Sequence, residues 1–466
     1  MRKLTWVLLP LCLAALGCSG NGGGTTGISG TSGGSSGGST GGGFTYSEVI
    51  AGDGGSANDS LAAAMASDGR IGIAYYEDVD QQHKSIAYSE LDATGALTRT
   101  VTLVPSVYNV SELSIAFDQQ GNALIAYLGN DAAVVEPHEQ NGDGGVFWQE
   151  SDLALAKVTP AGQLTTEYVV HKGNEALAGN PVSDNALWEV VGLSPAIQIL
   201  PSGKVLLAYR DVHDGQFTTF ANADLETAIG TPGGSWQHVV AIAGRDEPDP
   251  NFANKGLGAG TSLASFDGVV GLLASGQTAI GDIYQGLYQA TYVDGGWASK
   301  SELFAGDPVA ANLGQGFAPT GGPALAADPT SGFGAAWTDQ TGGVLYYSGS
   351  TDGVHWSNPS PVFGSGTGGW FPNLAFDPTF TPPQPAVIYF ICSPESGKHL
   401  GECSTPQLRV SERIPRGGQS YDWSNLQIDP QGGAFPHLFF GAGGQMVAVY
   451  RSLQTGGILL ARQATP

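Results

Sequence analysis

The sequence has 466 residues, of which 71 are glycine and 27 are proline, and only 13% are charged. Glycine costs roughly 1 kcal/mol per helical position relative to alanine, so this composition excludes a mainly helical protein. The hydrophobic content of 41% is sufficient for a large core, which excludes a chain that is disordered throughout. The formal net charge of −24 argues against a nucleic-acid partner, because an acidic surface repels phosphates.

Residues 1–17 have the organisation of a signal peptide. Two basic residues precede an apolar stretch over 4–16, which is too short for a stable membrane span. The stretch ends in a small residue followed by Cys18, and this arrangement resembles the lipobox of bacterial lipoproteins. The resemblance implies that Cys18 carries the lipid and that Ser19 directs the protein to the outer membrane. The sequence does not determine which leaflet of that membrane holds the lipid. The alternative is an ordinary secretory peptide with a chance cysteine.

Residues 18–43 follow as a predicted tether. Among the 25 residues of 19–43 there are 13 Gly, 6 Ser and 4 Thr, too few apolar side chains to offset the chain entropy of folding. Such a segment reaches about 25–30 Å and holds a folded domain, predicted over 44–466, away from the bilayer. The membrane is therefore an expected partner through the lipid alone.

Two cysteines remain in the predicted domain, Cys392 and Cys403. They close a short loop in an oxidising compartment, so a disulfide is the expected state. Paired thiolate ligands for a metal are the alternative, although two cysteines at this spacing match no metal motif.

The domain consists of a repeated unit. Short apolar or alternating runs, bounded by Gly, Pro, Asp and Asn, predict strands, and four strands make one antiparallel sheet. An aromatic residue closes the second strand of most units, and a tryptophan opens the fourth strand at Trp236, Trp297, Trp356 and Trp423. Seven units are counted, near 58–104, 110–170, 193–243, 259–305, 320–363, 369–428 and 434–466.

Seven such units predict an all-β fold, a seven-bladed β-propeller of four-stranded antiparallel blades. The last unit has only three strands, ending near 458–462, whereas residues 44–52 resemble the fourth strand of other units. The N-terminal strand is therefore expected to complete the last blade and close the ring, which removes exposed sheet edges.

Two segments carry a family resemblance. Residues 73–78 followed by 85–88 resemble the repeat of bacterial secreted propellers in the sialidase-like superfamily. Residues 350–356, Ser-Thr-Asp-Gly-Val-His-Trp, resemble the Asp-box of that superfamily in a form one residue shorter than the commonest. The Asp-box is a structural turn, so this resemblance concerns the fold and not the chemistry.

The longest loops are predicted on one face of the ring, at 129–150, 171–192, 244–259, 305–320 and 391–406. Loops on a rigid scaffold often carry binding residues, so this face is the expected functional face. Aromatic side chains beside carboxylates suit sugar binding. The candidate ligand-binding residues are Trp148, Trp188, Trp370, His213 and Asp211.

Acidic side chains predicted on the same face allow a calcium site. Asp78, Asp80 and Asp143 are the candidate ligands, because calcium prefers oxygen donors. Their spacing matches no complete metal motif, and the alternative is solvated loop charge.

The expected function is that of a lipid-anchored binding or scaffold module for a glycan or an envelope protein. The alternative is a sialidase-like glycoside hydrolase, a family that grips its substrate with three arginines. Arg413-Ile414-Pro415 resembles the Arg-Ile-Pro motif of that family, but it follows the Asp-box, whereas the family places it before. No catalytic residue is assigned, and the sequence has no recognisable hydrolase or phosphate-loop motif.

Overall fold

The computed structural model describes most of the chain beyond residue 42. The described ranges are 43–52, 60–80, 83–107, 111–130, 151–170, 190–212, 223–244, 255–276, 285–304, 322–328, 330–339, 344–364, 369–391, 405–417 and 420–464. In these ranges no helix is both long and apolar enough to cross a membrane.

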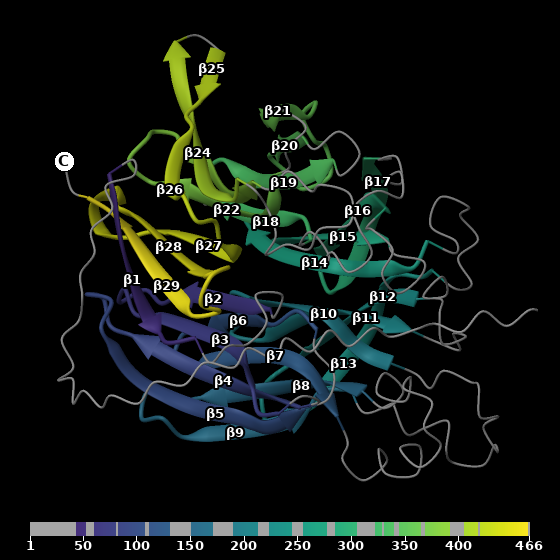
Figure 1. The fold of residues 1–466 in the computed structure, drawn as a ribbon. Coiled ribbons are helices and arrows are strands. Elements are labelled where there is room, and N and C mark those ends of the chain that lie inside the picture. Colours follow the sequence, from purple (N-terminus) through teal and green to yellow (C-terminus); the bar gives the residue numbers. More distant parts are fainter. Residues whose placement is uncertain are drawn as a thin grey trace, which may run out of the picture. The chain divides into compact units, whose positions relative to one another are not determined.

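Within the described ranges, the strands form seven antiparallel sheets, each built from strands that follow one another along the chain, with β1 as the exception (Figure 1). Blade 1 contains β2 (Leu61–Met65), β3 (Ile71–Asp78), β4 (Lys84–Leu91) and β5 (Leu97–Val107). Blade 2 contains β6 (Ser114–Phe117), β7 (Ala123–Asn130), β8 (Ser151–Val158) and β9 (Leu164–Tyr168). Blade 3 contains β10 (Val190–Ile199), β11 (Val205–Val212), β12 (Ala223–Gly230) and β13 (Trp236–Ile242). Blades 4 and 5 contain β14 (Leu257–Phe266), β15 (Val269–Gly276), β16 (Gln285–Val293) and β17 (Gly296–Phe304); β18 (Ala324–Asp328), β19 (Gly332–Asp339), β20 (Val344–Ser350) and β21 (Ser360–Gly364). Blades 6 and 7 contain β22 (Trp370–Asp377), β23 (Gln384–Ile391), β24 (Gln407–Gly417), β25 (Ser420–Trp423) and β26 (Leu426–Asp429); β27 (Ala434–Phe440), the short 3-10 helix η4 (Ala442–Gly444), β28 (Met446–Arg451), β29 (Ile458–Gln463) and β1 (Phe44–Ile50).

The first and last strands of the domain pair with each other. β1 runs antiparallel to β29, with Phe44 opposite Gln463 and Ile50 opposite Ile458. Figure 1 shows purple β1 beside yellow β29. Each inner strand also contacts the inner strand of the next blade, and β27 contacts β2, so the ring is closed. The predicted seven-bladed propeller and its N-terminal closing strand are confirmed.

The core consists of layers between blades. The largest buried clusters each join two adjacent blades, as where Tyr76 of blade 1 packs with Ile125 of blade 2. Val449 of blade 7 shares a cluster with Ile73 of blade 1. A strand that is buried on both faces has a continuous apolar sequence, which explains the apolar runs that predict the second strand of each unit.

The Asp-box forms the turn between β20 and β21. Asp352 Oδ1 accepts hydrogen bonds from the backbone N–H groups of Val354 and His355, at 2.9 and 2.8 Å. Ser350 Oγ accepts one from Gly353 N–H at 2.8 Å, and Trp356 forms an isolated bridge with Ser350. The motif is thus a self-contained turn whose polar groups bond to one another.

The prediction that a tryptophan begins the fourth strand of a blade agrees with the structure in blades 3 and 4 and not in blades 5 and 6. Trp236 begins β13 and Trp297 lies near the start of β17, whereas Trp356 precedes β21. Trp423 ends β25, which pairs with the C-terminal half of β24, while the separate strand β26 pairs with its N-terminal half. Blade 6 therefore departs from the predicted four strands because β24 is long enough to pair with two strands in succession.

Candidate functional site

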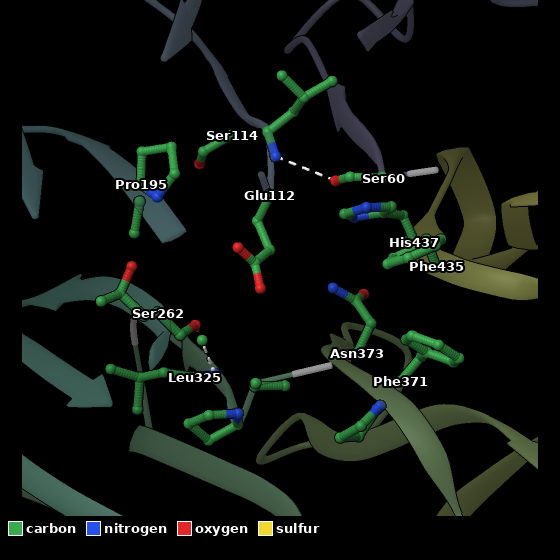
Figure 2. A pocket seen from close by; sticks show the side chains of 18 of the residues that line it. Ser60, Glu112, Ser114, Pro195, Ser262, Leu325, Phe371, Asn373, Phe435 and His437 are labelled. Atoms are coloured by element: carbon green, nitrogen blue, oxygen red, sulfur yellow. Dashed lines mark hydrogen bonds between the residues drawn. The ribbon is translucent and has the colours of Figure 1, made fainter. Parts of the chain in front are cut away.

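A cavity lies at one end of the central channel, where the seven inner strands begin. Its volume is about 220 Å³. Every blade contributes residues to its lining, including Ser60, Glu112, Ser262, Asn373 and His437 (Figure 2). The predicted long-loop face is at the same end, because the links between blades lead directly into these strand starts.

Four inner strands have the same backbone irregularity where they line the channel. Ser194, Phe371 and Phe435 have positive φ angles of 48°, 52° and 49°, and Gly260 has 56° in the equivalent place. Each lies at a shift in strand register, which marks a β-bulge. A bulky residue at positive φ costs of order 1–3 kcal/mol and persists only where its surroundings hold it, often at a functional site.

Prolines follow three of these positions. Pro195, Pro372 and Pro436 lie directly after the positive-φ residue, and all three line the cavity. Proline cannot donate a ladder hydrogen bond, so within a sheet it is confined to edges and bulges. The bulge therefore permits rigid, apolar rings to line the channel where a regular strand would exclude them.

Polar side chains on the inner strands join four pairs of neighbouring blades through hydrogen bonds. Ser60 Oγ accepts a hydrogen bond from Leu113 N–H at 3.0 Å. The equivalent bonds run from Ile197 N–H to Ser114 Oγ at 3.1 Å, from Leu325 N–H to Ser262 Oγ at 3.0 Å and from Leu438 N–H to Asn373 Oδ1 at 2.9 Å. These bonds fix the side chains that line the cavity.

Glu112 is the one acidic side chain among the described residues that line the cavity. Its Oε2 accepts hydrogen bonds from Ser194 Oγ at 2.8 Å and from Ser111 Oγ at 3.1 Å. Figure 2 shows its carboxylate near the middle of the cavity. The two hydroxyl groups hold the carboxylate in this orientation.

His437 lies on the side of blade 7 and faces blade 1. Its Nε2 is 3.1 Å from the carbonyl oxygen of Leu61, to which it donates a hydrogen bond. Burial lowers the pKa of His437 to about 4, and the bond to the Leu61 carbonyl opposes this shift. The ring is therefore neutral at neutral pH, and its Nδ1 is an acceptor.

Two of the predicted ligand-binding residues, Trp370 and Asp211, lie in the described ranges, and neither is among the residues that line this cavity. Trp370 begins β22 and is only 1% exposed, in a cluster with Phe371 and Phe390. Its ring is part of the core and is not exposed to a ligand, so the structure does not support Trp370 as a ligand-binding residue. Asp211 lies within β11 and is fully buried, so it is not on the ligand-facing surface either.

Two candidate metal ligands are described, and each contacts the side chain of a Lys or His residue. Asp78 forms an ion pair with Lys84 across the hairpin of β3 and β4. Asp80 contacts His83 Nδ1 at 2.8 Å and accepts the His83 backbone N–H at 2.8 Å. Over the described ranges, no group of three His, Cys, Asp or Glu side chains is arranged to hold a metal ion.

The remaining predicted site residues lie outside the described ranges. They are the lipidation candidate Cys18, the disulfide candidates Cys392 and Cys403, the loop candidates Trp148, Trp188 and His213, and the metal candidate Asp143.

The arginines of the described ranges do not gather at the channel. None of the described residues that line the cavity is Arg or Lys. Arg413 lies on β24 and stacks on the Tyr421 ring, 4.3 Å from its centroid. Tyr209 donates to Glu226 Oε2 at 2.7 Å, yet both side chains are enclosed within blade 3.

Two arginines of the described ranges do flank a tyrosine–glutamate pair in blade 1: Tyr88 donates to Glu90 Oε2 at 3.0 Å, and Arg70 and Arg99 each form an ion pair with Glu90 at 2.8 Å. These residues are not among the described residues that line the cavity.

The most perturbed carboxyl group lies away from the cavity. Burial, together with the adjacent carboxyl of Asp377, raises the pKa of Glu412 to about 8. Asp377 ends β22, whereas the cavity residues of this blade begin the same strand. This carboxyl pair is thus at the opposite end of the inner strand, and we assign it no role in the cavity.

The sequence contained a signal for the cavity that the loop-based prediction missed. A tetrapeptide with proline second and Leu or Ile fourth recurs at the starts of four inner strands: Ser194–Ile197, Gly322–Leu325, Phe371–Leu374 and Phe435–Leu438. Its third position supplies Asn373 and His437 to the cavity. The third position is alanine in the other two copies, so the recurring proline is the pattern that marks the channel mouth.

The fold and the site define the chain as a seven-bladed β-propeller with a cavity at the mouth of its channel. No family model and no curated protein matches the sequence. Among solved structures, it is similar to the BP39L lectin from Burkholderia pseudomallei, with 14% identity, a TM-score of 0.52 and coverage of 90% of this chain and 97% of the lectin. That likeness supports the propeller fold alone, because the identity is so low.

Two sialidases are also similar, with lower TM-scores. The K499G mutant of the NanB sialidase from Streptococcus pneumoniae has 15% identity and a TM-score of 0.43, with coverage of 89% of this chain and 70% of that chain. The Trypanosoma rangeli sialidase in complex with sialic acid has 10% identity and a TM-score of 0.46, with coverage of 90% and 59%.

Proposed function

We propose that the protein is a lipid-anchored binding module that holds a glycan at the mouth of its central channel. The observation that carries this proposal is the cavity itself, in which fixed polar groups alternate with rigid apolar rings. Glu112 and Asn373 supply the hydrogen-bonding groups, and the half-buried Phe435 supplies the apolar contact. Sugars bind where polar groups converge beside aromatic surface, and pockets with a few placed polar groups are typical ligand sites.

Two further considerations favour a binding role. Among the described residues that line the cavity there is no basic group to grip a substrate carboxylate. The lectin similarity adds an analogy at the level of the fold, which hosts many functions. An envelope protein as ligand remains the second candidate from the sequence, and a chain tethered through Cys18 and 19–43 would meet either ligand at the membrane surface.

The test is a screen of the purified protein against a glycan array, followed by calorimetry on each hit. The proposal expects saturable binding to at least one glycan, and a loss of at least tenfold in affinity for Asn373→Ala, which removes a cavity hydrogen bond. Absence of binding to every glycan would contradict it. Release of sialic acid from α-linked sialosides would support the glycoside hydrolase in its place.

A further inference from the structure

Two polar side chains on adjacent inner strands lie together in the cavity. Asn373 of β22 and His437 of β27 occupy the third position of the recurring tetrapeptide in blades 6 and 7, and these two strands contact each other. Both side chains line the cavity, and Figure 2 shows them on the same side of it. Two backbone groups determine which polar atoms of these side chains are turned to a ligand.

The amide of Asn373 presents a hydrogen-bond donor. Its Oδ1 accepts the backbone N–H of Leu438 at 2.9 Å. Because a backbone N–H can only donate, this contact fixes the orientation of the amide, and the N–H₂ group takes the other position. Figure 2 shows the amide nitrogen turned toward the middle of the cavity. Asn373 can therefore donate a hydrogen bond to a ligand.

The ring of His437 presents an acceptor on the neighbouring strand. Its Nε2 is 3.1 Å from the carbonyl oxygen of Leu61, which can only accept, so Nε2 carries the proton. Burial lowers the pKa of His437 to about 4, so the ring is neutral at neutral pH and Nδ1 is an acceptor. The cavity thus offers one neutral donor and one neutral acceptor from two adjacent blades.

Apolar rings on the same two strands lie beside the polar groups. Phe435 lies two residues before His437, is half-buried and lines the cavity. Its ring contacts Phe371, with the ring centroids 4.6 Å apart, so packing between blades 6 and 7 holds it in place. Pro372 and Pro436 also line the cavity. Removal of a methyl group from water against this surface favours binding.

An acetamido group combines the three matching features in one planar unit. Its carbonyl oxygen accepts a hydrogen bond, its N–H donates one, and its methyl group is apolar. In a trans amide the oxygen and the N–H point in opposite directions, so two separate elements suit it best, as Asn373 and His437 provide. A hydroxyl group at the same position of a sugar has no apolar part for Phe435.

We propose that the cavity recognises the acetamido group of an N-acetylhexosamine. The carbonyl oxygen of this group accepts from Asn373, its N–H donates to His437, and its methyl group packs on Phe435. This inference rests on the proposed glycan-binding function and names the class of sugar. The recognised groups are neutral, so the expected preference depends on hydrogen bonds and apolar contact.

The test compares sugars that differ in one group. The purified full-length protein is titrated by calorimetry with the methyl β-glycosides of N-acetylglucosamine and N-acetylgalactosamine, and with those of glucose and galactose. Two hydrogen bonds and an apolar contact predict that at least one acetylated glycoside binds about tenfold to a hundredfold more tightly than its hydroxyl counterpart. Equal or weaker binding of both acetylated glycosides would overturn the inference.

A matched pair of variants locates the effect. Asn373→Asp keeps the acceptor for the Leu438 N–H but replaces the N–H₂ donor with oxygen, so the preference for the acetylated glycoside should fall about tenfold. Asn425→Asp makes the same change at an exposed position, where the side-chain oxygen accepts from Arg409, and should keep the preference. A preference that is unchanged in Asn373→Asp would refute the assignment.

A second variant keeps the test decisive if Asn373→Asp does not fold. Phe435→Leu removes the aromatic face while keeping an apolar side chain, and should weaken binding of the acetylated glycoside about threefold to tenfold. Unchanged affinity in this variant would count against the cavity as the acetamido site.

The failures of the two proposals can be told apart. Binding on the array that is confined to glycans without an acetamido group would overturn this inference and leave the glycan-binding function standing. No glycan binding at all would contradict both. Displacement of the bound glycoside by an N-acetylated amino-acid amide of equal or higher affinity would assign the cavity to a peptide, and would also overturn the inference.

Discussion

Ser194 Oγ donates a hydrogen bond to Glu112 Oε2 across the junction between blades 2 and 3, at 2.8 Å. Ser194 also has a positive φ of 48°, at the bulge where β10 enters the channel. The bulge thus orients the hydroxyl group that in turn orients the carboxylate. A backbone irregularity in one blade determines the position of a side chain in its neighbour.

Removal of this hydroxyl group should loosen the carboxylate. We expect Ser194→Ala to lower the free energy of unfolding by about 1 kcal/mol, the usual net value of one hydrogen bond, and to weaken glycan binding in the cavity. Calorimetric titration and thermal unfolding measure the two effects. Ser202→Ala, in an exposed turn of the same blade, is the control and should change neither. Unchanged glycan affinity in Ser194→Ala would show that Ser194 has no positioning role.

Closure of the ring should depend on the first strand of the domain. Phe44 of β1 is 2% exposed and packs with residues of blades 6 and 7. We expect Phe44→Ala to cost about 3–5 kcal/mol, because it leaves a cavity in this layer. Leu97→Ala, on β5 with 49% exposure, should cost less than about 0.5 kcal/mol. Denaturant unfolding monitored by circular dichroism compares the two, and equal losses would mean that β1 does not close the ring.

The sequence predicted this closure because the relevant signals are local. The alternation in 44–52 and the three-stranded last unit together required a partner for β29, and the structure supplies β1. The Asp-box was likewise predictable, since its hydrogen bonds join residues within seven positions of one another.

The cavity could not be predicted in the same way. Glu112 and His437 lie in blades 2 and 7, far apart along the chain, and the closed ring alone brings them to one cavity. The sequence did not reveal that Trp370 is buried, because Trp370 begins β22 beside a bulge that interrupts the period-two signal of burial. A bulge shifts the alternation of buried and exposed residues, so the buried face of such a strand cannot be predicted from the sequence pattern. In this protein the bulges lie at the cavity.

Anchoring of the protein should depend on one thiol. The lipobox resemblance predicts that Cys18→Ala releases the protein from the membrane fraction into the soluble fraction. Fractionation followed by immunoblotting measures this, with Ser19→Ala as the neighbouring control that should remain attached. A Cys18→Ala protein that stays with the membrane would contradict lipid attachment at this residue.

The raised pKa of Glu412 predicts a loss of stability at alkaline pH. The folded state holds a proton on this carboxyl up to about pH 8, whereas the unfolded state releases it near pH 4.5. Folding therefore binds a proton between these values, and stability should fall as the pH rises from about 4.5 to 8. Glu412→Gln should show a smaller decrease in melting temperature between pH 6 and pH 9, whereas Glu302→Gln, on the outer strand β17 where the side chain is exposed, should follow the wild type. If Glu412→Gln shows the same decrease in melting temperature as the wild type, the proton is bound by another group.

The lowered pKa of His437 predicts the opposite dependence of stability on pH, in the acidic range. Its pKa is about 4 in the folded state, below the ordinary value of 6.5, because burial disfavours the charged ring. Between these values the unfolded state binds more protons, so stability present above pH 6.5 is lost as the pH falls toward 4, by on the order of 2 kcal/mol. His437→Gln retains an N–H donor for the Leu61 carbonyl but cannot titrate. Its free energy of unfolding, measured by urea denaturation at pH 7 and pH 4.5, should fall less than that of the wild type. His238→Gln, exposed on β13, should retain the wild-type dependence, and an acid loss unchanged by His437→Gln would show that protonation of this ring does not open the junction between blades 7 and 1.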